Sequence, residues 1–169
     1  MKKIVLFLFL SSYAFLLQAD IYALKSGVLK HGEGPLSSGR EQGYDLNVEV
    51  LWEDTIIYAH PAVGADINNQ GFTNFLYAGL AWEGYLFGTV VWELFWGGAI
   101  HDGHLTPSDP KRRALGSRVL FREAIALGFD ISDNMTFTIL YDHYSHSGTD
   151  ESLYNQGTDN TGIRLAYYF

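Results

Sequence analysis

The chain has 169 residues with a formal net charge of -8, 15% aromatic residues and no cysteine. This length suits a single domain, the acidic balance argues against a nucleic-acid-binding protein, and the lack of cysteine excludes disulfides and thiolate chemistry. Although 47% of the residues are hydrophobic, no segment beyond the first twenty residues is apolar over the length that a membrane-spanning helix needs.

The N-terminal segment has the features of an export signal. Lys2 and Lys3 precede an apolar stretch over residues 4–17, and Ala19 supplies a small residue at the expected cleavage position. This order of charged, apolar and small residues is typical of a secretory signal peptide. We therefore expect residues 1–19 to be a signal peptide and residues 20–169 to form one exported domain. The alternative is an uncleaved anchor helix, for which the stretch is short.

The rest of the chain alternates apolar and polar residues with the two-residue period of β-strands. Eight segments carry this pattern: 21–30, 44–52, 56–67, 73–82, 87–98, 115–131, 135–146 and 159–169. Short turns and longer polar loops connect them in alternation, as in up-and-down barrels of bacterial outer membranes. Closure leaves no free sheet edge, which a lipid environment demands. We predict an all-β fold, an eight-stranded antiparallel transmembrane β-barrel in the outer membrane of a Gram-negative bacterium.

The two faces of the predicted strands differ in polarity. In segment 44–52, Leu46, Val48 and Val50 alternate with Asn47 and Glu49, so that one face suits hydrocarbon and the other a small packed lumen. A soluble barrel would have the opposite polarity. By the same alternation, six charged residues face inward and are expected to form an ion-pair network: Glu49, Glu93, Arg118, Arg122, Asp130 and Arg164.

Two residues fit this pattern poorly. Pro61 interrupts segment 56–67, and because proline cannot donate to a strand ladder we expect a bulge there. Glu123 falls on the apolar face of segment 115–131 unless the register shifts.

The last predicted hairpin carries residues with catalytic chemistry. His143 and Ser145 share one face of their strand by the two-residue period, and Asp159 lies on the same face of the next strand. A serine hydroxyl becomes a nucleophile when a histidine takes its proton, and a carboxylate can orient that histidine. The three residues thus form a hydrolase constellation on the outer surface at the extracellular end. The alternative is that they are polar groups in the headgroup region without a catalytic role.

The same residues resemble a known family. The runs HYSHSG at 143–148 and NQGTD at 155–159, followed by a closing strand that ends in an aromatic residue, are similar to the motifs of the PagL-type lipid A 3-O-deacylases, also called acyloxyacyl hydrolases. Members of this family are small eight-stranded outer-membrane barrels. The resemblance implies that Ser145 is the nucleophile, His143 the base and Asp159 the orienting acid, and that the oxyanion hole is formed by Asn155 and by backbone amides near Ser147 and Gly148.

Two departures from the family pattern concern this site. His146 stands where the family usually has asparagine, which puts one polar contact near the oxyanion site in question. The acid is aspartate rather than the more familiar glutamate, so its shorter side chain has to approach the histidine more closely.

Two other clusters carry residue types that can bind ligands. The basic run Lys111, Arg112 and Arg113 is either a solvated loop or a contact for lipid A phosphates, which guanidinium groups suit. His101, Asp102 and His104 are too few in a polar loop for a metal site, and we expect a solvated loop there.

Together these features predict an outer-membrane serine esterase that removes an ester-linked acyl chain from the lipid A of lipopolysaccharide. The resemblance implies the 3-O position and no cofactor. We expect no nucleic-acid partner and a monomer or a homodimer. The alternative is a non-catalytic small outer-membrane barrel with a structural or adhesive role.

Overall fold

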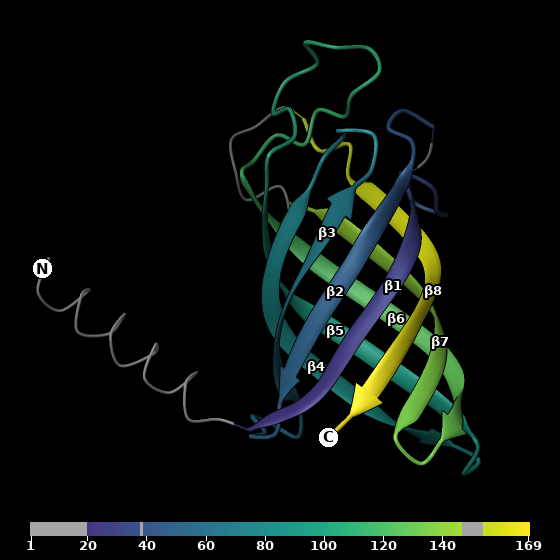
Figure 1. Ribbon diagram of the computed structural model, residues 1–169. Coiled ribbons are helices and arrows are strands. Elements are labelled where there is room, and N and C mark those ends of the chain that lie inside the picture. Colours follow the sequence, from purple (N-terminus) through teal and green to yellow (C-terminus); the bar gives the residue numbers. More distant parts are fainter. Residues whose placement is uncertain (1–19, 38, 147–153) are drawn as a thin grey trace, which may run out of the picture.

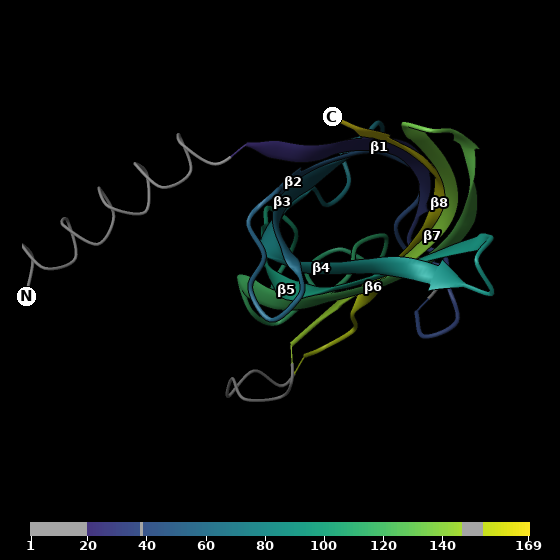
Figure 2. The same ribbon diagram turned by 90° about the horizontal axis from the view of Figure 1, so that it is seen from below.

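The strands of the protein form one closed sheet. The computed structural model describes residues 20–37, 39–146 and 154–169, so the expected signal peptide lies outside the described residues. The described strands are β1 (Ile21–His31), β2 (Tyr44–Trp52), β3 (His60–Asn68), β4 (Phe75–Leu86), β5 (Val90–His101), β6 (Val119–Ser132), β7 (Met135–Ser145) and β8 (Thr158–Tyr168). Each pairs antiparallel with the next, and β8 pairs with β1, as Figures 1 and 2 show. The predicted eight-stranded antiparallel barrel is confirmed.

One difference from the predicted segments is at β3, which begins at His60 rather than at residue 56. Ile57 and Tyr58 have positive φ angles of 50° and 62° and form a turn instead. Pro61 is therefore the second residue of β3, and it pairs with Leu80 without a register shift. The prediction of a bulge at Pro61 is wrong, because a proline is tolerated where a strand begins.

Long and short connections lie at opposite ends of the barrel. The β1–β2 and β5–β6 connections are long and lie at the end where β7 ends and β8 begins, whereas the β2–β3, β4–β5 and β6–β7 connections lie at the other end (Figure 1). The β4–β5 turn is built on Phe87 and Gly88, both with positive φ, as the tight turns of hairpins require. In outer-membrane barrels the long loops face the outside of the cell and the short turns face the periplasm.

The outer wall of the barrel is apolar, and its interior contains charged residues together with a cluster of buried aromatic and aliphatic side chains. Outward positions such as Leu94, Ile125 and Leu165 are exposed, whereas the inward positions next to them on the strands are buried. Apolar side chains on the outside and polar ones in the lumen are what a membrane-embedded barrel requires. Within the described residues no helix is long and apolar enough to cross a membrane.

The lumen contains the expected ion-pair network, with two corrections. Arg122 bonds Asp142 at 3.0 Å and Glu49 at 3.4 Å, and Arg164 bonds Glu49 at 3.0 Å and also pairs with Glu93. Arg118 is not part of it, because it precedes β6 and donates to the backbone carbonyls of His101, the last residue of β5, and of Gly103. Asp130 is not part of it either, since it is exposed at the barrel end and accepts hydrogen bonds from Tyr85 and Thr136.

Candidate active site

His143 and Asp159 form a hydrogen-bonded pair on the outer face of the barrel. They are register partners in the β7–β8 ladder, which brings their side chains together. His143 Nδ1 lies 2.5 Å from Asp159 Oδ1, and the His143 side chain keeps 14% exposure whereas the Asp159 side chain is fully buried. A carboxylate on Nδ1 holds the proton there when the ring is neutral and leaves Nε2 as a proton acceptor.

Asp159 is buried although it lies on the outward side of β8, because the β1–β2 loop folds across it. The backbone N–H groups of Leu36 and Ser37 donate to Asp159 Oδ2 at 2.7 and 2.9 Å. The exposed end of the pair is therefore the imidazole ring. On its other side the ring contacts the segment before β8, since a Cβ on Gly157 would lie 3.1 Å from His143 Cε1.

Ser145 is the last residue of β7 and lies on the same outward face as His143. The odd-numbered residues of β7 are exposed or partly exposed and the even-numbered ones are buried, as the two-residue period predicts. Within the described residues no hydrogen bond joins Ser145 to His143. Such bonds are often long before substrate binds, so the arrangement places a hydroxyl and a base on one face without a formed contact between them.

Asn155 is bound to the backbone just after Ser145. Its Oδ1 accepts from His146 N at 3.2 Å, and its Nδ2 donates to His146 O. The ring of His146 is buried, with Nε2 2.7 Å from the Tyr154 carbonyl oxygen. Asn155 therefore ties the segment before β8 to the end of β7 next to Ser145. Ser147 and Gly148, the other residues expected at the oxyanion hole, lie outside the described residues.

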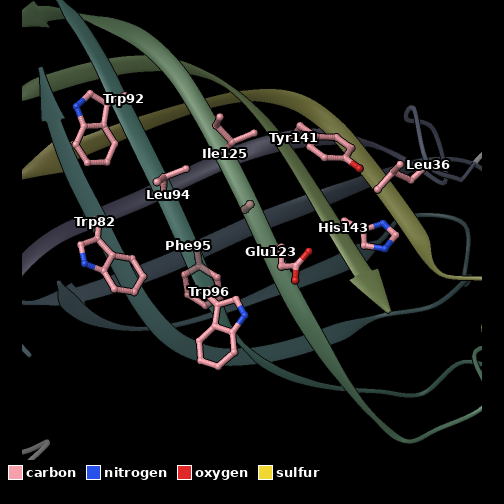
Figure 3. A pocket seen from close by; sticks show the side chains of 11 residues that line it. Leu36, Trp82, Trp92, Leu94, Phe95, Trp96, Glu123, Ile125, Tyr141 and His143 are labelled. Atoms are coloured by element: carbon pink, nitrogen blue, oxygen red, sulfur yellow. The ribbon is translucent and has the colours of Figure 1, made fainter. Parts of the chain in front are cut away.

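A groove of about 580 Å³ crosses the outer wall and ends at His143. Figure 3 shows its lining, which extends from His143 on β7 across β6 and β5 to Trp82 on β4. Most of the lining is hydrophobic: Leu36, Trp82, Trp92, Leu94, Phe95, Trp96, Ala124 and Ile125. A groove of this chemistry, open to the bilayer, can hold a hydrocarbon chain with its polar end beside His143.

Glu123 is a charged residue in this apolar groove. It remains on the outward face of β6 without a register shift, and it is the partner of His143 in the β6–β7 ladder. His143 thus has a carboxylate residue on each neighbouring strand. Charged residues on the lipid-facing side of a barrel are unfavourable, so this position is a candidate for function. The sequence showed the misfit of Glu123 but not its place beside His143.

The basic run of the β5–β6 loop is not a uniform cationic surface. Arg113 is buried, and its Nη1 donates to the carbonyls of Gln156 and Gly157 at 3.3 and 3.1 Å. Arg113 therefore holds the segment before β8. Arg112 lies over the Phe72 ring at 5.3 Å, and Lys111 is exposed; for all three residues a phosphate contact stays a prediction.

The histidines at the end of β5 make local contacts. His101 Nε2 lies 2.7 Å from the Ser117 carbonyl oxygen, and His104 Nδ1 lies 2.8 Å from Ser108 Oγ. Among the residues that the structure describes, no group of three or more potential ligands is arranged to hold a metal ion.

Comparison with known proteins identifies the family. The family model of the lipid A 3-O-deacylase PagL matches residues 39–168. The chain belongs to the PagL family. The match includes β2 to β8 and with them His143, Ser145, Asn155 and Asp159, so the resemblance of the last hairpin is confirmed at the level of the family. No curated protein matches the chain in sequence.

Solved structures show the same barrel. The crystal structure of the outer membrane enzyme PagL has a TM-score of 0.63 at 14% identity and covers 87% of this chain and 99% of that chain. A de novo designed transmembrane β-barrel has a TM-score of 0.57 at 12% identity, covering 90% and 98% of the two chains. Neisserial surface protein A has a TM-score of 0.55 at 12% identity, covering 88% and 97%. This member of the PagL family is an outer-membrane barrel.

Proposed function

We propose that the protein is a lipid A deacylase that hydrolyses an ester-linked acyl chain, at the 3-O position in accordance with its family. The observation that carries the proposal is the His143–Asp159 pair at the end of a hydrophobic groove on the lipid-facing wall. A lipid in the outer leaflet can enter such a groove sideways, with its acyl chain along the tryptophans and its ester beside His143. No cofactor takes part in this chemistry.

The reaction follows from the roles of three side chains. Ser145 Oγ attacks the ester carbonyl carbon while His143 Nε2 takes its proton, and Asp159 stabilises the imidazolium that forms. The C–O bond to the sugar then breaks, and the sugar oxygen takes the proton from His143. Water, deprotonated by the same histidine, attacks the acyl-serine ester and releases the fatty acid.

The oxyanion of each tetrahedral intermediate needs hydrogen-bond donors at fixed positions. We propose Asn155 for this role, because its side chain is bound to the His146 backbone beside Ser145. One hydrogen of its NH2 group donates to the His146 carbonyl, and the second hydrogen is available for the substrate. Backbone amides near Ser147 and Gly148 are proposed to add further donors.

The test is the lipid A of cells that express the wild type or Ser145→Ala. Mass spectrometry of extracted lipid A should show the loss of one ester-linked chain with the wild type and intact lipid A with the variant. Equal amounts of heat-modifiable protein in the outer membrane serve as the control for folding. Intact lipid A in both strains would favour the alternative, a barrel with a structural or adhesive role.

We further propose that residues 1–19 are a signal peptide cleaved after Ala19. N-terminal sequencing of protein from the outer membrane should begin at Asp20, whereas an N-terminus at Met1 would contradict cleavage.

A further inference from the structure

The β1–β2 loop is packed onto the start of β8, where Asp159 lies. Gly32 N donates to Asn160 Oδ1 at 3.1 Å, and Thr161 Oγ1 donates to the Glu33 carbonyl at 3.1 Å. These two contacts fix the loop to the residues that directly follow Asp159. The loop is therefore held in place by Asn160 and Thr161 of β8, in addition to its contacts with Asp159.

The two carboxylate oxygens of Asp159 have different partners. Oδ2 accepts the N–H groups of Leu36 at 2.7 Å and Ser37 at 2.9 Å, and Oδ1 lies 2.5 Å from His143 Nδ1. Hydrogen bonds to a charged acceptor are strong and directional. Because two donors hold Oδ2, rotation of the carboxylate is restricted and Oδ1 stays directed at the histidine.

Gly34 permits this close approach. A Cβ at position 34 would lie 2.5 Å from Asp159 Oδ2 and 2.8 Å from Asp159 Cγ. The φ angle of Gly34 is outside the left-handed region, so the need for glycine is one of space and not of backbone conformation. Any side chain at this position has to displace either the loop or the carboxylate.

We propose that residues 34–37 are a positioning element of the active site, which orients Asp159 through the Leu36 and Ser37 amides. The proposal rests on the proposed function and goes beyond it, because the family model matches only residues 39–168 and this segment precedes them. The segment also accounts for an aspartate at position 159. It occupies the space beyond the carboxylate, so a longer glutamate side chain has no room between the loop and His143.

The experiment compares Gly34→Ala with Leu36→Ala in purified, refolded protein. Fatty acid release from lipid A gives kcat and KM, and proton NMR detects the low-field resonance of the hydrogen-bonded His143 Nδ1–H. Gly34→Ala should lower kcat by more than about tenfold; the upper bound is the ~10⁴-fold loss that a triad histidine in the wrong tautomer causes. It should leave KM nearly unchanged and shift or remove the resonance. Leu36→Ala keeps the backbone donor and removes only a groove side chain, so it should raise KM and preserve kcat and the resonance.

Wild-type kcat and an unchanged resonance in Gly34→Ala would overturn the proposal. A wild type that releases no fatty acid would refute the proposed function, while the resonance would still decide whether the loop orients the pair. If Gly34→Ala fails to fold, Asp159→Glu decides. A lower kcat and an altered His143 resonance in Asp159→Glu would support a site that has room only for aspartate. A wild-type kcat in this variant would contradict the proposal.

Discussion

Replacing Asp159 with asparagine should place the wrong group against His143, the proposed base. In the wild type Asp159 Oδ2 accepts two backbone N–H groups, from Leu36 at 2.7 Å and Ser37 at 2.9 Å. An asparagine has one acceptor oxygen, and it must face these donors because its NH2 group offers them no lone pair. The NH2 group then points at His143 Nδ1, which can accept it only when the ring proton is on Nε2.

A histidine with its proton on Nε2 cannot take the proton of Ser145, so the chemical step is impaired while the groove is intact. We expect kcat to fall by ~10⁴-fold, the effect of the equivalent change in a serine hydrolase triad, which corresponds to about 5 kcal/mol. KM for lipid A should change little. The assay is fatty acid release by purified protein, with Asp133→Asn as the matched control because Asp133 is exposed in the β6–β7 turn at the opposite end of the barrel.

A folded Asp159→Asn variant whose kcat falls by less than about tenfold, or roughly 1.4 kcal/mol in barrier height, would refute this reasoning. It would mean either that Asp159 does not set the tautomer of His143 or that the two amides do not fix the asparagine orientation. The low-field proton resonance of His143 separates these two explanations: an asparagine that turns its Oδ1 to Nδ1–H keeps a hydrogen-bonded proton there, whereas an NH2 group held against Nδ1 provides no acceptor and removes the resonance.

Three further predictions concern the lumen, the outer loops and the groove. Arg122→Met leaves Asp142 buried without its cation, so the free energy of unfolding in a denaturant titration should fall by about 3–5 kcal/mol, and a change below about 1 kcal/mol would contradict the network's role. Burial raises the pKa of Glu41, but hydrogen bonds from His31 and other neighbours outweigh this and leave the pKa below its ordinary value. The stability that Glu41 supplies is therefore present above about pH 4.3 and is lost as pH falls further. Glu41→Gln should be less stable than the wild type at pH 7. A difference in the free energy of unfolding between the two proteins that does not shrink in acid would be inconsistent with this. Glu123→Leu should preserve or raise stability because it removes a charge from the lipid-facing wall, yet lower kcat/KM by about tenfold or more if the carboxylate bonds the substrate; unchanged kcat/KM would show that Glu123 has no role in the reaction.

The barrel could be predicted from the sequence because its physical causes are periodic. Alternation along each strand indicates which face meets lipid, and closure follows from the need to pair every edge. The strand ends were less predictable, since Ile57, Tyr58 and Phe87 adopt positive φ angles that non-glycine residues rarely show. The tertiary structure imposes these turns, and nothing in the local sequence marks them.

The site was predictable to the extent that it depends on strand pairing. The two-residue period puts His143 and Asp159 on one face, and the observed register joins them. The Leu36 and Ser37 amides could not be predicted, because backbone donors leave no residue signature and depend on how a loop folds over a distant strand. The burial of Arg113 could not be predicted for a related reason: nothing in a basic run of a polar loop indicates that one guanidinium is buried against the Gln156 and Gly157 carbonyls.

The proposed mechanism requires that Ser145 carries the covalent intermediate. To test this, purified protein is treated with a long-chain alkyl fluorophosphonate, which reacts with activated serine hydroxyls, and its peptides are analysed by mass spectrometry. We expect a single adduct on the peptide that contains Ser145, formed in parallel with the loss of fatty acid release and absent from His143→Ala. Full inhibition with the adduct on another residue, or a protein that releases fatty acid and is never modified, would contradict the proposed mechanism.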